Sequence, residues 1–112
     1  MLPKQYRLKK KKDFKLVFEK GKTFNNKFLF LKGAKNALKN SRFAFVVGLK
    51  TSKKAVVRNR IKRLLREIIR EKLNDIKSGF DVVIRVRAEI VNKDYKEIKK
   101  ELESLLKKAE LI

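Results

Sequence analysis

The chain has 112 residues, 43% of them hydrophobic, which suits a single domain with one core over residues 1–112. Its 33 Lys and Arg outnumber its 12 Asp and Glu, so the net charge is +21 at pH 7. Self-repulsion of this size destabilises a compact fold unless an anion neutralises it. We therefore expect nucleic acid as the partner, with an anionic membrane surface as the second possibility.

Several chemistries are excluded by residues that the chain lacks. The absence of Cys rules out disulfides and thiolate metal sites and suits a cytoplasmic location. Without His the chain has no side chain suited to proton transfer near neutral pH, and its acidic residues lie scattered among Lys and Arg. No segment approaches the ~20 apolar residues of a membrane span, and the basic start lacks a signal peptide's apolar segment. We expect no catalytic residue and no metal site in the protein itself.

The first predicted elements are a basic arm and a short helix. Residues 1–12 form an extended arm that is rich in Lys. Asp13 is a candidate N-cap and Gly21 a candidate C-terminal stop for the helix between them. Within it Phe14, Val17 and Phe18 share one face, because they are spaced three and four residues apart.

Two apolar runs predict strands. KFLFL (27–31) and RFAFVVGL (42–49) are rich in Phe and Val, and the segment between them carries turn residues. This arrangement predicts a hairpin. Residues 24–27 fit a strand or a loop, and the pattern does not distinguish the two.

The longest predicted helix covers residues 55–73. Val57, Ile61, Leu64 and Ile68 fall on one side, typical of a face packed on a core. The opposite side is a basic stripe, formed by Asn59, Lys62, Arg63, Arg66 and Arg70. Guanidinium groups grip phosphate oxygens bidentately, so this stripe is suited to contact an RNA or DNA backbone.

The last predicted elements are a strand and a helix. VVIRVR (82–87) alternates, with Val83, Arg85 and Arg87 on its exposed face. Asp94 can cap a helix with an apolar stripe formed by Ile98, Leu102, Leu105 and Leu106. The element order predicts an α/β fold, a mixed sheet with helices packed on it, but does not fix the strand order.

Longer motifs connect the chain to a family. R-N-R-I-K-R-L-L-R-E (58–67) follows K-x-x-x-x-A-V-V (50–57), and R-L-x-x-x-x-D-F-x-x-V-F-x-x-G stands upstream at 7–21. Together they resemble the protein subunit of bacterial ribonuclease P over essentially the whole chain. The resemblance implies an α+β sandwich in the order α-β-β-β-α-β-α. It also implies that the RNR helix lies in a left-handed βαβ crossover, against the usual preference.

The resemblance also implies a function. The family's protein binds a catalytic RNA, and this RNA removes the 5′ leader of precursor tRNA in a reaction that requires Mg²⁺ for the RNA. We infer no obligate protein partner, and we expect no membrane partner because the surrounding strands need the apolar face of the 55–73 helix for a core. The resemblance assigns the leader to a central cleft with Phe14 and Phe18, where rings can stack on single-stranded bases. The implied RNA contacts are Lys50, Lys54, Arg58, Asn59, Arg60, Lys62, Arg63 and Arg66.

Two departures from the family pattern leave questions open. Lys53 stands where the family often has Gly, so the loop before the signature can differ in shape. The segment 21–28 is slightly short, so either Leu29 and Leu31 or Phe28 and Phe30 face the cleft. Two other functions also fit the composition: a structural RNA-binding protein of ribosomal type, and a membrane-surface protein using a basic amphipathic helix.

Overall fold

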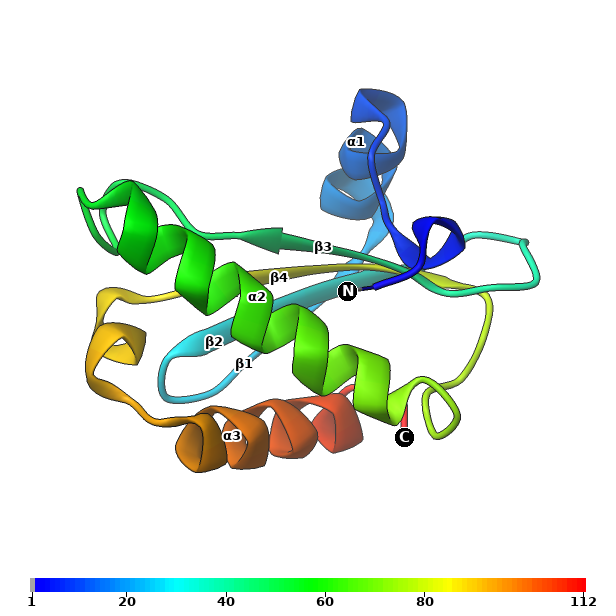
Figure 1. The fold of residues 1–112 in the computed structure, drawn as a ribbon. Coiled ribbons are helices and arrows are strands. Elements are labelled where there is room, and N and C mark those ends of the chain that lie inside the picture. Colours follow the sequence, from blue (N-terminus) through cyan, green and yellow to red (C-terminus); the bar gives the residue numbers. More distant parts are fainter. Residues whose placement is uncertain (1) are drawn as a thin grey trace.

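The computed structural model describes residues 2–112, which form a four-stranded sheet and three α-helices (Figure 1). Two short 3-10 helices, η1 (Lys4–Tyr6) and η2 (Ala88–Asn92), complete the fold. The α-helices are α1 (Lys11–Lys20), α2 (Ala55–Lys72) and α3 (Tyr95–Lys108). The strands are β1 (Lys22–Asn25), β2 (Leu29–Lys35), β3 (Arg42–Val46) and β4 (Phe80–Val86).

The sheet is mixed, with the spatial order β1-β2-β4-β3. β2 pairs antiparallel with β1 and β4, whereas β3 and β4 run parallel and are joined through α2. Seen from the face that α2 covers, with β3 and β4 pointing upward, β4 lies to the left of β3 (Figure 1). The crossover that carries α2 is therefore left-handed, the opposite of the common arrangement.

One face of the sheet packs on α2 and α3 and forms the main core (Figure 1). Leu29 and Leu31 of β2 and Ile84 of β4 point into this core, where they meet the apolar stripes of both helices. The predicted stripe of α3 is buried throughout, and the Asp94 side chain accepts a hydrogen bond from the Glu97 amide, as an N-cap should. On α2 the fully buried residues are Ile61, Leu65, Ile68 and Ile69.

The opposite face of the sheet is covered only at one end, by α1. Val17 packs there with Leu8, Ala44 and Val83 in a small second cluster. Within residues 2–112 no helix covers the rest of this side of the sheet, which we call the open face.

Three sequence-based expectations are wrong. β2 and β3 do not form a hairpin, because β4 inserts between them and pairs with both. Local turn residues cannot report an insertion by a strand some forty residues later in the chain. Asp13 is not the N-cap of α1; that position is taken by Lys10, and Asp13 pairs with Arg42 instead. Val83 is buried although it lies on the open face, because α1 covers it.

The N-terminal segment is part of the packed structure within the described range. Leu2 is only 1% exposed and belongs to the main core, and Leu8 is buried under α1. Arg7 forms an isolated parallel bridge with Phe43, next to edge strand β3. Residues 22–25 form β1, which includes part of the 24–27 segment that fits either a strand or a loop on sequence alone. Gly21 ends α1 as predicted, and a side chain there would collide with the Val17 carbonyl.

Candidate nucleic-acid interface

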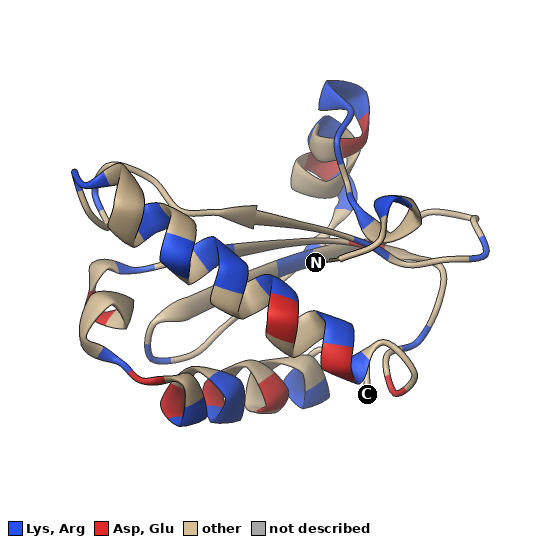
Figure 2. Ribbon diagram, in the orientation of Figure 1, with Lys and Arg blue, Asp and Glu red and all other residues tan. Residues whose placement is uncertain are grey.

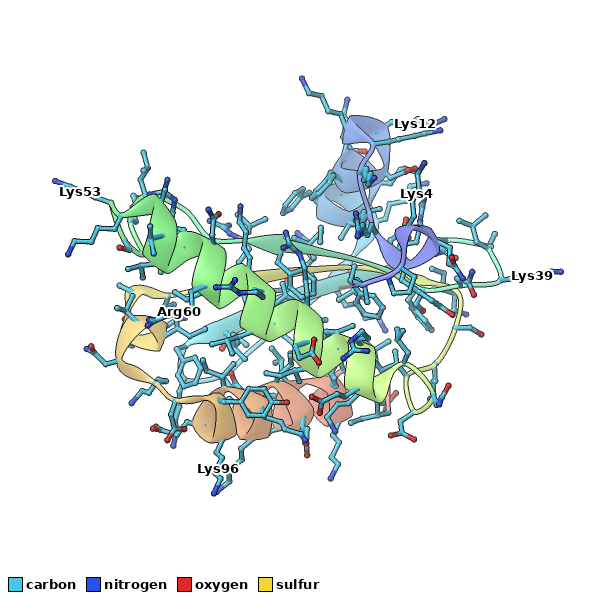
Figure 3. The ribbon with its side chains drawn as sticks, in the orientation of Figure 1. Lys4, Lys12, Lys39, Lys53, Arg60 and Lys96 are labelled. Atoms are coloured by element: carbon cyan, nitrogen blue, oxygen red, sulfur yellow. The ribbon has the colours of Figure 1, made fainter. Side chains whose placement is uncertain are left out.

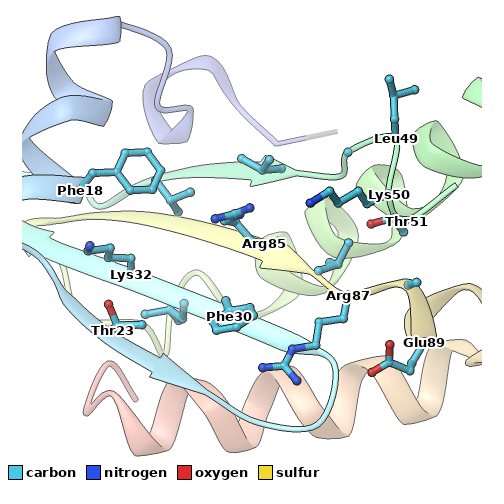
Figure 4. A pocket seen from close by; sticks show the side chains of 16 residues that line it. Phe18, Thr23, Phe30, Lys32, Leu49, Lys50, Thr51, Arg85, Arg87 and Glu89 are labelled. Atoms are coloured by element: carbon cyan, nitrogen blue, oxygen red, sulfur yellow. The ribbon is translucent and has the colours of Figure 1, made fainter. Parts of the chain in front are cut away.

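A groove of about 810 Å³ crosses the open face between α1 and the loop that precedes α2 (Figure 4). It starts at Phe18 of α1 and ends at residues 48–51, directly before α2. Its floor is the sheet itself, and its sides are basic and apolar. The labelled side chains in Figure 4 come from all these elements: Phe18, Thr23, Phe30, Lys32, Leu49, Lys50, Thr51, Arg85, Arg87 and Glu89.

Strand register explains why these residues meet. Phe30 pairs with Arg85, which pairs in turn with Val46, so the three lie in one row across the sheet. The next row contains Thr23, Lys32 and Val83. Alternation along each strand places all these side chains on the open face, opposite the core. Three segments distant in sequence thus contribute to one continuous surface.

Cations accompany both aromatic rings in the groove. The Cζ of Arg87 lies 4.5 Å from the centroid of the Phe30 ring, and the Nζ of Lys32 lies 5.6 Å from that of Phe18. Each pair combines an apolar flat surface with a positive charge. This combination is suited to a single-stranded nucleic acid, which offers unstacked bases and phosphates together.

The two predicted cleft phenylalanines differ in their positions. Phe18 is 44% exposed and lines the groove, whereas Phe14 is partly buried against the small cluster under α1 and does not line it. The open question about β2 also has an answer. Phe30 faces the groove, while Phe28 and Leu29 are buried in the main core.

Several groove residues were not predicted from the sequence. No local pattern marks Lys32 or Thr23, and the alternation of β4 marks Arg85 and Arg87 only as the exposed side of a basic strand. The missing information was the pairing of β2 with β4. An alternating basic strand indicates an exposed face, but it does not indicate which aromatic residue stands beside it.

The basic stripe of α2 begins where the groove ends. Asn59, Arg60, Arg63 and Arg66 are exposed, and the basic residues form blue bands along α2 in Figure 2. Figure 3 labels Arg60 beside the first half of α2. None of these three arginines forms an ion pair within residues 2–112, so their guanidinium groups are available to an anion.

The other predicted RNA-contacting residues lie around this stripe. Lys50 lines the groove, and Lys54 is the exposed residue at the N-cap of α2. Lys62 is half-buried. Arg58 is also half-buried, and its Nη1 donates a hydrogen bond of 2.9 Å to the Ser52 carbonyl. Arg58 therefore fixes the loop before α2 as well as contributing charge.

Ion pairs neutralise the C-terminal part of α2. Arg70 pairs with Glu67 on the same helix, and Lys72 pairs with Glu103 of α3 at 2.9 Å. The Tyr95 hydroxyl donates a 2.7 Å hydrogen bond to Glu71, which lowers the pKa of that carboxyl and raises the pKa of Tyr95 to about 12. The free positive charge of α2 is consequently concentrated toward its N-terminal end.

A polar cluster holds α1 on the open face. The Arg42 guanidinium donates to both carboxylate oxygens of Asp81, at 2.8 and 2.7 Å, and its Nη1 lies 3.3 Å from Asp13 of α1. Asn36 donates a further 2.8 Å hydrogen bond to Asp81. The hydrogen bond to Asp81 is the main cause that raises the pKa of Arg42 above its ordinary value. Arg42 therefore links α1, which forms one wall of the groove, to the sheet.

The part of the chain that the structure describes holds neither a cluster of metal ligands nor a membrane-spanning helix. Among residues 2–112 no three His, Cys, Asp or Glu side chains gather as a metal site requires. In the same range, no helix combines the length and apolar character needed to cross a bilayer.

The left-handed crossover and the basic open face define a class of small α+β proteins. Similarity to known sequences and structures identifies the family within this class. The family model described as Ribonuclease P matches residues 2–110. A ribonuclease P protein component from Cyanothece sp. is 41% identical, with 100% of this chain and 98% of that relative covered. A second, from Syntrophomonas wolfei, is 40% identical over 99% of this chain and 92% of that relative.

Solved structures agree with this assignment. The RNase P protein of Thermotoga maritima superposes with a TM-score of 0.83 at 35% identity, covering 91% of this chain and 96% of that one. A Staphylococcus aureus RNase P protein mutant with defective mRNA degradation activity gives 0.91 at 29% identity, covering 97% and 92%. The chain belongs to the ribonuclease P protein family.

Proposed function

We propose that this chain is the non-catalytic subunit of cytoplasmic ribonuclease P, which binds the catalytic RNA through α2 and the 5′ leader of precursor tRNA in the groove. The groove carries this proposal, since the accessible faces of the Phe18 and Phe30 rings lie there together with cations. Membership in the family supports the same role.

The groove is suited to a strand of any sequence. Phe18 and Phe30 offer ring faces for stacking, and every base has a face that can stack. Lys32, Arg85 and Arg87 supply charge for the phosphates between the bases. Such contacts read no base edges, so the groove favours precursor over mature tRNA simply because the precursor has a leader.

The stripe on α2 is suited to the backbone of a folded RNA. Its arginines can grip phosphates bidentately, and the loop at Lys50 brings the stripe next to the groove. The protein thereby aligns the leader beside the catalytic RNA. We assign bond cleavage, and the Mg²⁺ that it requires, to that RNA.

The test is precursor tRNA cleavage by the reconstituted holoenzyme at low Mg²⁺. Protein alone should leave precursor intact, and adding it to the cognate RNA should strongly increase cleavage. Phe30→Ala and Phe18→Ala should each weaken the preference for precursor over mature tRNA about fivefold or more, at roughly 1–3 kcal/mol per stacked base. Affinity for the catalytic RNA should stay unchanged.

Leu38→Ala is the matched control, because Leu38 is an exposed apolar residue outside the groove. Equal loss of preference in Leu38→Ala would show that the effect is not local to the groove. Cleavage by protein alone would overturn the proposal, as would tight co-sedimentation with ribosomal subunits combined with indifference to precursor tRNA.

A further inference from the structure

A second hollow, of about 890 Å³, lies at the end of the sheet where β2 is longer than β1. The pairing of β1 with β2 stops at Lys22 and Gly33, so Ala34 and Lys35 have no partner on β1. The hollow, here called the notch, is bounded by α1 on one side and by the C-terminal end of α3 on the other. It is lined differently from the groove: apart from the floor residue Leu31, the two have no lining residue in common.

The charge of the notch is strongly positive. Five lysines line it, against a single acidic residue, Glu110; they are Lys20, Lys22, Lys35, Lys77 and Lys108. All five are exposed, and within residues 2–112 none of them forms an ion pair. Lys108 donates a 3.1 Å hydrogen bond to the Asn25 carbonyl, which holds one ammonium group at the rim.

The walls of the notch are apolar. Leu16 of α1 is 46% exposed there, and the half-buried rings of Phe24 and Phe80 lie among the lining residues. Hydrogen bonds take up some of the carbonyl groups at the end of α3, which reduces their repulsion of an anion. The last turn of this helix is closed by hydrogen bonds from the Glu110 amide to Lys107 and from the Leu111 amide to Leu106.

We infer that the notch is a second RNA site, which binds a short single-stranded segment with its phosphates on the lysines and a base or ribose on the apolar walls. A duplex keeps its base faces inside its own stack, so only an unpaired strand can use the walls. The lysine ammonium groups are point charges without the fork geometry of Arg, which suits a flexible chain of phosphates better than one fixed carboxylate. The inference goes beyond the proposed function, because it concerns a different surface.

The first experiment maps binding on the full-length protein by amide NMR, with a six-residue oligouridine as the probe. The amides of Gly33, Ala34 and Phe80 report on the notch, and those of Arg85 and Arg87 report on the groove. Both sets should shift. Lys35→Gln/Lys77→Gln should weaken the notch shifts alone, and Phe30→Ala should weaken the groove shifts alone.

The matched control is Lys39→Gln/Lys96→Gln, which removes the same charge at exposed positions that line neither hollow. The notch variant should lower the slope of log affinity against log salt by about 1.4, at about 0.7 for each lost phosphate contact to single strands. The control variant should keep the slope of the original protein. Notch amides that stay unmoved when the groove is saturated would overturn the inference.

Two further probes test the ligand class. If hexaglutamate shifts the amide signals of the notch with an affinity equal to or higher than that of oligouridine, the ligand of the notch is an acidic peptide and not RNA. Inorganic tripolyphosphate that binds as tightly as the oligouridine would show that the apolar walls are not used, and would overturn the single-strand assignment. If oligouridine does not bind at the notch while Phe30→Ala still lowers the preference for precursor over mature tRNA, the second site is excluded and the proposed function stands.

Discussion

The two faces of the sheet differ although the same strands build them. Leu31 of β2 is 1% exposed beneath α2 and α3, while its neighbours Phe30 and Lys32 line the groove on the opposite face. One face uses its side chains for packing, and the other keeps them accessible. Strand alternation, rather than distance along the chain, thus separates stability from binding in this small domain.

α1 is the element that complicates this division. It covers part of the open face, yet its exposed Phe18 belongs to the groove. Its attachment combines a small apolar cluster with the pairing of Asp13 and Arg42. Stability and binding should therefore be more strongly coupled at α1 than on the rest of the open face.

The largest expected effect is on the covered face. Leu31→Ala should lower the free energy of unfolding by about 2–5 kcal/mol, because it leaves a cavity in the main core. Phe30→Ala, one residue away, should cost clearly less, because its half-buried ring leaves no enclosed cavity. Urea unfolding of both variants measures the difference, and equal losses would contradict the separation of the two faces.

Arg42→Met tests the coupling at α1. It leaves the Asp81 carboxylate buried without its cation, and we expect a loss of about 2–3 kcal/mol, somewhat below the range for fully buried pairs. Asp13→Asn should cost less in global stability but should speed amide hydrogen exchange in α1. Unchanged exchange in α1 would show that the apolar cluster alone holds the helix.

The basic stripe of α2 allows a comparison between free and paired cations. Arg63→Ala should lower the salt slope of binding to the catalytic RNA by about 0.7–0.9 for its phosphate contact. Arg70→Ala should change the slope less, because Arg70 is already paired with Glu67. Lys62→Ala and Arg58→Ala should lower it also, and Arg58→Ala should in addition loosen the loop that it bonds. Equal slopes in Arg63→Ala and the original protein would place Arg63 outside the interface.

The smallest effect concerns pH and the contact between α2 and α3. The hydrogen bond from Tyr95 lowers the pKa of Glu71 below its ordinary 4.5. The contribution of this hydrogen bond to the free energy of unfolding is therefore fully present above pH 4.5 and is lost as the pH falls through the lowered pKa. For Tyr95 the pKa is raised from 10.0 to about 12, so the stabilisation is present below pH 10 and disappears through about 12. In a plot of the free energy of unfolding against pH, Glu71→Gln should reduce both the loss at acidic pH and the loss at alkaline pH. An unchanged plot would contradict this account.

The amino-acid sequence by itself determined the features that depend on neighbours along the chain. The α3 stripe with its Asp94 cap, the end of α1 at Gly21 and the basic face of α2 follow from helical periodicity and local hydrogen bonding. The motif around residues 58–67 indicated the family, and with it the left-handed crossover that periodicity alone could not supply.

Only the tertiary structure decided which elements meet. The pairing of β4 between β2 and β3 removed the expected hairpin and brought Arg85 beside Phe30. The packing of α1 turned Phe14 toward the apolar cluster and left Phe18 accessible, and it used Asp13 as an ion-pair partner rather than a cap. Strand order and helix docking depend on contacts between residues far apart in sequence, and no local pattern encodes them.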